Sequence, residues 1–134
     1  VVTPCEKWSV CRESLDSILE HTAPRHRMVY VDGNSPGPVR RYVSDKAREK
    51  GFEVVRTDRY LTPNEARLMG LARVDTPYVV FVDNDVVVTP RWVDAMLECA
   101  EETGAEVVSP VVCQGEPVHQ TIHCAGGECG VKEI

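Results

Sequence analysis

Short apolar runs and helix-length amphipathic stretches alternate along the whole chain. Runs of strand length stand at residues 1–3, 28–31, 52–55, 78–82 and 106–112, with a further candidate at 118–124. Between them, apolar residues recur at helical spacing in stretches at residues 8–20, 36–50, 63–73 and 90–103. This order of strands and helices predicts an α/β, Rossmann-like fold: a mostly parallel, doubly wound central sheet with helices on both faces.

Capping residues indicate where the helices begin and end. Thr62 and Glu65 have the spacing of a capping box, so a helix should follow them directly. Ser35 is expected to be the N-cap of the preceding helix, with Pro36 in its first turn and Gly51 at its end. The run at residues 78–82 is apolar without interruption, which is typical of a parallel strand covered on both faces.

The chain's length and charge limit the classes of function. Its 134 residues fit one compact domain, residues 1–134, and no apolar run approaches the ~20 residues that cross a bilayer. The chain opens without a basic leader or an initiator Met, so we expect a shortened chain. The net charge of −6, with no basic run longer than Arg40-Arg41, disfavours nucleic acid as a partner. An acidic protein can still bind a phosphorylated molecule through a divalent cation.

Six cysteines are spread through this α/β pattern. Disulfide scaffolds are shorter and rich in loops, so the cysteines are expected to be mostly reduced thiols. This favours a cytoplasmic location, or the cytoplasmic face of a membrane in a longer protein.

Candidate ligand-binding residues stand where the predicted strands end, since doubly wound sheets bind ligands there. Pro4 follows the first strand, Asp32 the second, and Asp83-Asn84-Asp85 the unbroken apolar run. Asp32 is either a ligand-binding carboxylate or a residue that caps its own turn. The triplet is either a solvated turn or a site for a hard cation such as Mg²⁺ or Mn²⁺. No GxGxxG, Walker or GxSxG motif occurs, which disfavours dinucleotide, P-loop and α/β-hydrolase sites.

Six segments in order resemble family 2 glycosyltransferases. They are Val-Val-Thr-Pro at 1–4, Ser-Leu-Asp-Ser-Ile-Leu at 14–19, Val-Tyr-Val-Asp-Gly-Asn-Ser at 29–35, Asn-Glu-Ala-Arg-Leu-Met-Gly-Leu at 64–71, Val-Val-Phe-Val-Asp-Asn-Asp at 79–85 and Ile-His-Cys-Ala-Gly-Gly at 122–127. The resemblance covers nearly the whole chain and implies a GT-A fold that binds a nucleotide-diphosphate sugar, with UDP-sugar favoured. It further implies transfer of the sugar to a hydroxyl of a glycan, lipid or other acceptor, with inversion.

The resemblance also implies a role for each matching residue. Pro4, Cys5 and Glu6 would line the base and ribose pocket, and Asp32 would accept a hydrogen bond from the base. Arg67 would approach the diphosphate, where a guanidinium suits phosphate oxygens. Asp83 and Asp85 would form a DxD motif for Mn²⁺ or Mg²⁺, in which Asp83 contacts the ribose or a water on the metal and Asp85 contacts the metal itself. Asn84 would lie between them in the donor site.

The chain also departs from the family's pattern. The second Asp of the family's "VDD" is Gly33, and the Asn of its "ARN" is Leu68. None of Glu116, Glu128 and Glu133 matches the family's motif for the base that deprotonates the acceptor. We therefore expect the donor-binding part of a longer enzyme, or, as the alternative, a module that binds the donor without transferring it.

Two other interpretations of the chemistry stay open. His119, His123, Cys124 and Cys129 could form a zinc site, although their spacing does not pair as structural sites do. A receiver-type phosphoacceptor domain has the same order of elements. It expects paired acids after the first strand and a late Lys, for which only Glu6 and Lys132 are available.

Overall fold

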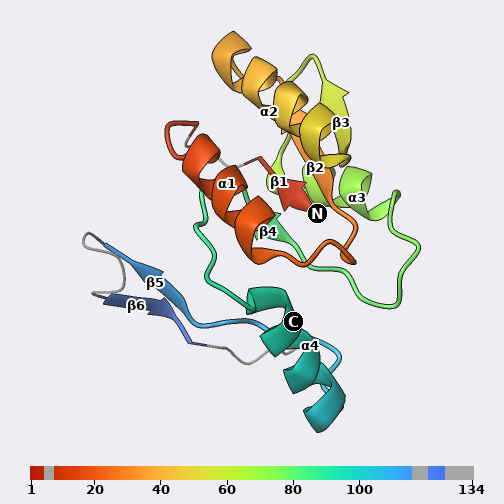
Figure 1. The fold of residues 1–134 in the computed structure, drawn as a ribbon, viewed down its shortest axis with the longest axis vertical. Helices are drawn as coiled ribbons and strands as arrows, with labels where there is room; N and C mark the ends of the chain where they lie inside the picture. The colour runs from red at the N-terminus through yellow and green to blue at the C-terminus, as the bar shows by residue number, and fades with distance from the viewer. Residues whose placement is uncertain (5–7, 116–120, 126–134) are drawn as a thin grey trace, which may run out of the picture. The chain divides into compact units, whose positions relative to one another are not determined.

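A computed structural model describes residues 1–4, 8–115 and 121–125, and it forms two compact units, residues 1–90 and 91–134. The first unit contains a four-stranded sheet, drawn in Figure 1. Its strands are β1 (Val2–Thr3), β2 (Val29–Gly33), β3 (Glu53–Thr57) and β4 (Val82–Asp83). They pair in the order β3-β2-β1-β4, and every pair is parallel. The predicted α/β class with a parallel sheet is confirmed.

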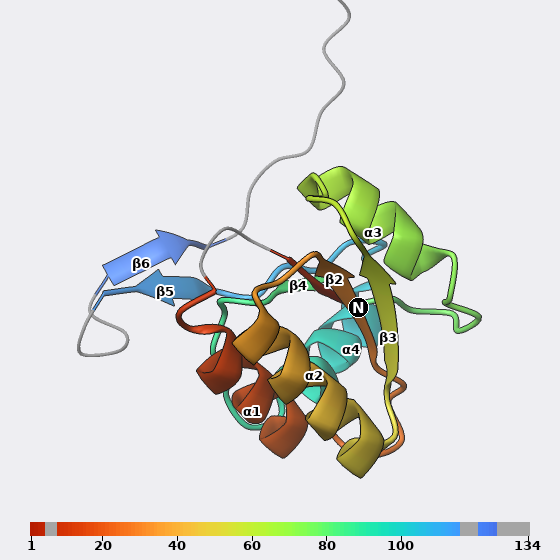
Figure 2. The same ribbon diagram turned by 90° about the horizontal axis from the view of Figure 1, so that it is seen from above.

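Three helices connect these strands: α1 (Cys11–His21), α2 (Gly37–Lys50) and α3 (Pro63–Leu71). Figure 2 shows α1 and α2 together on one face of the sheet and α3 on the other. This follows from the strand order, because the chain moves outward from β1 through β2 to β3 and then crosses back to β4. Right-handed crossovers in opposite directions place their helices on opposite faces.

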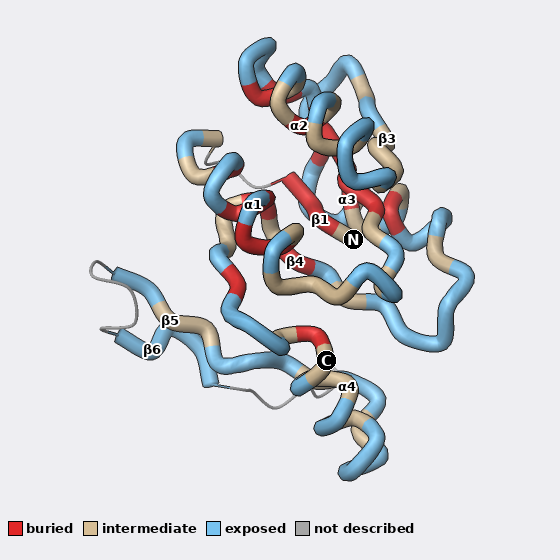
Figure 3. The backbone as a smooth tube through the Cα atoms, viewed as in Figure 1, coloured by how far each residue is buried: buried red, intermediate tan, exposed pale blue. Residues whose placement is uncertain are grey.

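The core of the first unit lies between the sheet and its helices (Figure 3). The central strand β2 is buried at all five positions, and Tyr30 and Val31 are fully enclosed. On the α3 side, Ala66 packs with Val31 and the loop residue Leu61. Gly70 brings α3 so close to β1 that an added Cβ would stand 2.2 Å from Val1 Cγ1.

The ends of the helices agree with the sequence in part. Both hydrogen bonds of the Thr62–Glu65 capping box are present, and Gly51 ends α2 in the left-handed conformation at φ 76°. The N-cap of α2, however, is Pro36 and not Ser35. The Ser35 backbone N–H and hydroxyl both donate to Asp32 instead, so Ser35 belongs to the turn that precedes the helix.

The prediction of a strand buried on both faces at residues 78–82 was wrong. The strand β4 comprises only Val82–Asp83, and the side chains of Tyr78, Val79 and Phe81 are exposed. The strand order explains this, because β4 lies at an edge of the described sheet and its neighbour β1 is two residues long. Ahead of Val82, the run has one described backbone partner in the sheet, the Val1 amino group, which donates to the Val80 carbonyl at 2.7 Å.

The second unit contains α4 (Trp92–Thr103) and the antiparallel pair β5 (Val112–Gln114) and β6 (Thr121–Cys124). The predicted strand at 106–112 was wrong, since extended pairing begins only at Val112. Val107 is 82% exposed, so burial does not draw this apolar stretch into a sheet. Within the described residues, no helix is long and apolar enough to cross a membrane.

Candidate active site

The order of the strands places a topological switch point at the carboxyl ends of β1 and β4. The chain leaves β1 toward β2 on one side and returns to β4 on the other, so the direction of winding reverses between β1 and β4. In doubly wound sheets, ligands bind at such a reversal, beyond the ends of the strands. The residues that end β1 and β4 are therefore the first candidates for a site.

Thr3 and Asp83 meet at this switch point because they are register partners on adjacent strands. Thr3 is fully buried, and its Oγ1 donates a hydrogen bond of 2.9 Å to Asp83 Oδ1. The Asn84 backbone N–H donates to the Thr3 carbonyl at 2.9 Å, which continues the pairing by one residue. The carboxylate of Asp83 is thus fixed by a buried hydroxyl that the motifs did not single out.

Arg67 extends from α3 toward the same carboxylate. Its Nη2 lies 3.7 Å from Asp83 Oδ1, and both side chains are about two-fifths exposed, at 41% and 39%. The capping box fixes the start of α3, and the close approach at Gly70 sets its distance from β1. The structure therefore brings together two of the residues assigned to the donor site, one cationic and one anionic, at the edge of solvent.

Asp85 is half-buried, and its side chain makes no hydrogen bond or ion pair with any residue in the described ranges. Two serines of α1 bind the backbone of the segment that follows Asp85. Ser14 Oγ donates to the Val86 carbonyl at 2.7 Å, and Ser17 Oγ accepts from the Val88 N–H at 3.1 Å. These serines lie among the buried positions of α1, so a polar residue within a predicted apolar stripe was the signal for them.

The triplet offers oxygen ligands of the kind that Mg²⁺ and Mn²⁺ prefer. Among the residues that the structure describes, no group of three or more His, Cys, Asp or Glu side chains could hold a metal ion. Mg²⁺ in nucleotide sites is bound by one or two carboxylates together with substrate phosphates and water. Asp83 and Asp85 fit that kind of site, in which the ligand completes the coordination.

Asn84 turns inward, with 1% of its surface exposed. Below it, Cys11 Sγ lies 3.1 Å from Tyr30 Oη. Burial raises the pKa of the Cys11 thiol and of the Tyr30 hydroxyl, while hydrogen bonds to the Asn84 side chain oppose both rises. The thiol and the hydroxyl therefore stay neutral. The polar side chains next to Asn84 in the Asp83-Asn84-Asp85 triplet are thus uncharged.

Asp32 is fully buried at the end of β2 and is already occupied by neighbouring donors. Its Oδ1 accepts the Ser35 N–H at 2.8 Å, while its Oδ2 accepts Ser35 Oγ at 3.0 Å and Arg56 Nε at 2.8 Å. The turn-capping role considered for Asp32 is therefore present. Arg56, which the motifs missed, is 32% exposed and covers the carboxylate.

The other predicted site residues are only partly described. Pro4 is buried at the end of β1, and Cys5 and Glu6 lie outside the described residues. The residues of the zinc alternative divide in the same way: His123 and Cys124 are exposed on β6, and His119 and Cys129 are outside. Glu116, Glu128, Lys132 and Glu133 are outside as well. Cys11, Cys99 and Cys113 are free thiols in the structure.

Comparison with known proteins identifies the family. The profile described as Glycosyl transferase family 2 matches residues 1–123. The chain belongs to this family, as the resemblance predicted, and its parallel sheet with helices on both faces agrees with the GT-A fold.

Individual relatives were found among curated proteins. The chain is 30% identical over 112 residues to polypeptide N-acetylgalactosaminyltransferase 15 of Homo sapiens, and 29% identical over 112 residues to the Mus musculus protein of that name. Each match covers 80% of this chain, and the chain spans 17% of the length of these relatives. No solved structure matches. The family and these relatives support a glycosyltransferase.

Proposed function

We propose that the first unit binds a UDP-sugar through Mn²⁺ or Mg²⁺ held by Asp83 and Asp85, for transfer of the sugar to an acceptor hydroxyl. The observation that carries this proposal is the pair of carboxylates at the winding reversal of the sheet. One of them is fixed by Thr3, and the other, Asp85, makes no polar contact with a described residue. Two carboxylates so close together repel one another, and a bound cation relieves that repulsion.

Each residue has a distinct part in this proposal. Asp83 and Asp85 hold the cation, which as a Lewis acid would neutralise charge on the departing diphosphate. Arg67 stands 3.7 Å from Asp83 and can turn its guanidinium fork to phosphate oxygens. Pro4, Cys5 and Glu6 are assigned to the base and ribose, Asn84 supports the turn, and Asp32 is assigned to the base.

The names of the relatives suggest which donor and acceptor to test first. Both are named polypeptide N-acetylgalactosaminyltransferases. We therefore propose a UDP-N-acetylhexosamine as the first donor and a Ser or Thr hydroxyl of a polypeptide as the first acceptor, beside glycan and lipid acceptors. No described residue matches the family's base motif, so the alternative remains a module that binds the donor and does not transfer it.

A thermal-shift panel of UDP, GDP, dTDP and their sugars, with and without Mn²⁺ or Mg²⁺, tests the donor site. A ligand at a hundred times its Kd stabilises the folded state by about 2.7 kcal/mol. We expect a shift that needs both nucleotide and metal, and its loss in Asp85→Asn. Asp45→Asn is the matched control, since Asp45 is an exposed carboxylate paired with Arg48 on α2. A nucleotide shift that survives in Asp85→Asn, or no shift at all, contradicts the proposal.

Transfer is tested separately from binding. Incubation with the donor that binds best and with a Ser/Thr peptide should yield a glycosylated peptide, detected by mass spectrometry. The coupling constant of the anomeric proton in the product shows whether the course is inversion, as the family resemblance implies, or retention. Metal-dependent binding without product would establish the binding module instead.

We also propose a cytoplasmic location, supported by the free thiols of Cys11, Cys99 and Cys113. Fractionation of cells that make the tagged protein, with thiol labelling of each fraction, tests it. Recovery in an oxidising compartment with blocked thiols would contradict it.

A further inference from the structure

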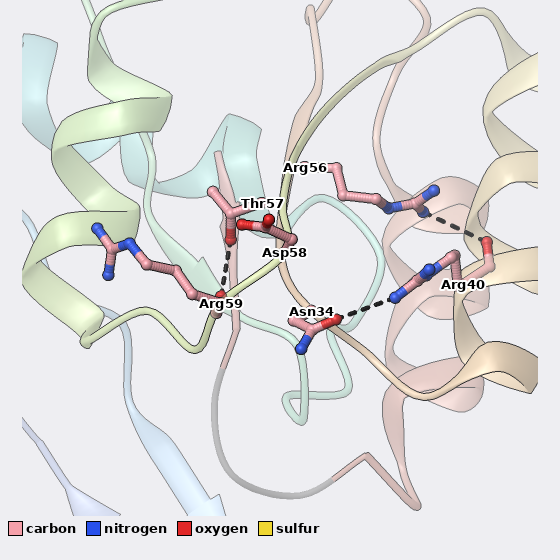
Figure 4. Close-up of a pocket in the computed structure, with 6 residues that line it drawn as sticks. All are labelled: Asn34, Arg40, Arg56, Thr57, Asp58 and Arg59. Atoms are coloured by element: carbon pink, nitrogen blue, oxygen red, sulfur yellow. Dashed lines mark hydrogen bonds between the residues drawn. The ribbon is translucent and has the colours of Figure 1, made fainter.

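A polar pocket lies at the ends of β2 and β3, and it is lined by Asn34, Arg40, Arg56, Thr57, Asp58 and Arg59. Figure 4 shows that the side chains of Arg40 and Arg56 lie side by side toward α2, whereas that of Arg59 points away toward α3. The pocket is separate from the carboxylates of the proposed donor site, which end β4. It shares Arg56 with Asp32, the residue assigned to the base, so the test below is run without nucleotide or divalent metal.

Arg40 is a half-buried cation whose partners are all neutral. Its Nη2 donates to Asn34 Oδ1 at 3.0 Å and to the Ser35 carbonyl at 3.4 Å. Its Nε is buried and has no hydrogen-bond partner among the described residues. Such an orphaned donor on a charged group lowers stability unless a ligand satisfies it.

The position of Arg40 in α2 adds a second unfavourable interaction. It lies in the first turn, where the partial charge of the helix is positive, and that turn contains no acidic residue. A cation at this end of a helix is repelled by the exposed N–H groups, and an anion there is favoured.

Arg56 places another guanidinium beside the first. Its Nη2 donates to the Arg40 carbonyl at 3.5 Å and to Ser44 Oγ at 3.3 Å, while its Nε is committed to Asp32. Within the described part of the chain, Nη1 of neither Arg40 nor Arg56 donates a hydrogen bond. These groups therefore leave several donors for a ligand between them.

The acidic residues near the pocket do not take the place of such a ligand beside Arg40. Glu65 forms a 2.9 Å ion pair with Arg59, the guanidinium that points away. Asp58 lines the pocket, but its charge acts on Arg59, where it adds to the effect of Glu65 in raising the Arg59 pKa. Asp32 is buried beneath Arg56 and neutralises one of the two charges. Arg40 therefore has no carboxylate partner among the described residues, and the one carboxylate in the pocket lining is Asp58.

We propose that this pocket binds a compact oxyanion, a phosphate or sulfate group, between Arg40 and Arg56, with the Asn34 amide as a third donor. A tetrahedral oxyanion offers several acceptor oxygens, which suits two guanidinium groups that approach from α2 and from β3. The group can be a free ion or a monoester on a larger molecule.

The test is a titration of ¹⁵N-labelled protein followed by the Nε–H resonances of arginine and the side-chain amide of asparagine. Sodium sulfate, inorganic phosphate and O-phosphoserine are added at constant ionic strength, with sodium chloride as the reference, and without nucleotide or divalent metal. We expect saturable shifts at Arg40, Arg56 and Asn34 with the oxyanions and not with chloride. Tighter binding of O-phosphoserine than of phosphate identifies an esterified group as the ligand, and the reverse identifies the free ion.

Three variants make the test specific. Arg40→Gln should raise the Kd about tenfold or more, the usual effect of losing a charged hydrogen bond. Asn34→Gly, which tolerates the positive φ of 63° at this position, should weaken binding less. Arg48→Gln removes an exposed charge farther along α2 and should leave the Kd unchanged. Asp85→Asn should also leave it unchanged, which separates this site from the donor site.

The proposal is overturned if the shifts grow linearly with anion concentration, if chloride reproduces them, or if Arg40→Gln binds as the unchanged protein does. Because Arg40 is outside the buried core, Arg40→Gln should stay folded. Should it unfold, unchanged oxyanion binding in Asn34→Gly, with no shift at the Arg40 Nε–H, also overturns the proposal.

Discussion

The hydroxyl of Thr3 and the carboxylate of Asp83 are joined by a 2.9 Å hydrogen bond between register partners on β1 and β4. Thr3 is fully buried, and the other acceptor near its hydroxyl, the Val82 carbonyl, is farther away at 3.5 Å. The bond fixes one oxygen of the first carboxylate of the triplet while leaving Asp83 partly open to solvent. The sheet itself thus orients a group of the candidate site.

Thr3→Val removes this donor and keeps the shape of the side chain. We expect the free energy of unfolding to fall by about 1 kcal/mol, the usual net value of one hydrogen bond. Metal-dependent nucleotide binding should weaken as well, since Asp83 loses its orientation. Urea unfolding and calorimetric titration measure the two effects. Thr3→Ser keeps the hydroxyl and should preserve binding, and equal losses in Val and Ser variants would show that the methyl group matters instead.

The Asp32–Arg56 pair should be strongly coupled in stability. Arg56→Gln leaves the fully buried Asp32 carboxylate without its cation, so we expect a loss of about 2 kcal/mol. In the double variant with Asp32→Asn, much of that loss should be recovered, because no buried charge remains. A double-mutant cycle by urea unfolding gives the coupling energy. Arg48→Gln, which breaks an exposed pair with Asp45, should cost less than about 0.5 kcal/mol, and a coupling near zero for Asp32 and Arg56 would refute this account.

Gly70→Ala should destabilise the first unit even though Ala favours helices. The added Cβ would stand 2.2 Å from Val1 Cγ1, and overpacking of this kind costs about 1–3 kcal/mol against a helix-propensity gain of about 1 kcal/mol. We expect a net loss of about 1 kcal/mol in urea unfolding. Gly37→Ala is the control, since its Cβ would meet nothing within 4 Å. Val1→Ala in the Gly70→Ala background should recover most of the loss, and failure to do so would place the strain elsewhere.

The capping box at α3 should persist far into acid. The ion pair with Arg59, and then hydrogen bonds from Thr62, lower the pKa of Glu65 to about 2 from an ordinary value of about 4.3. Because the folded-state pKa is the lower one, the stability contributed by Glu65 is complete above the ordinary pKa and is lost as the pH falls toward 2. A ¹³C titration of the Glu65 carboxyl carbon measures this pKa. Arg59→Gln should move it upward, and an unchanged value would remove the ion pair as the main cause.

The sequence predicts the first unit well because several local signals agree there. Helical periodicity, the Thr62–Glu65 box and Gly51 all depend on neighbouring residues, and the structure confirms them. The failures at residues 78–81 and 106–111 have another origin. An apolar run becomes a strand only where a neighbour offers backbone partners, and that depends on strand order, which no local pattern contains.

The residues of the candidate site also differ in whether the local sequence reveals them. Asp83 and Asp85 could be found because carboxylates after a strand stand out in the sequence. Thr3 could not, since it looks like an ordinary residue of a buried strand until the register joins it to Asp83. Ser14 and Ser17 stand out only as polar residues in an apolar stripe, and the sequence does not show their partners. Arg56 was hidden too, because its link to Asp32 spans two adjacent strands.

The enclosure of Asp32 affects the rate at which a ligand can bind to this carboxylate. Three donors already occupy this carboxylate, and Arg56 lies over it as a cover. A molecule arriving from solution meets the guanidinium first, and its own N–H can bond to Asp32 only after that guanidinium has swung aside. The movement of Arg56, and not diffusion, would then limit the rate of association at Asp32. The observed rate would level off at high ligand concentration.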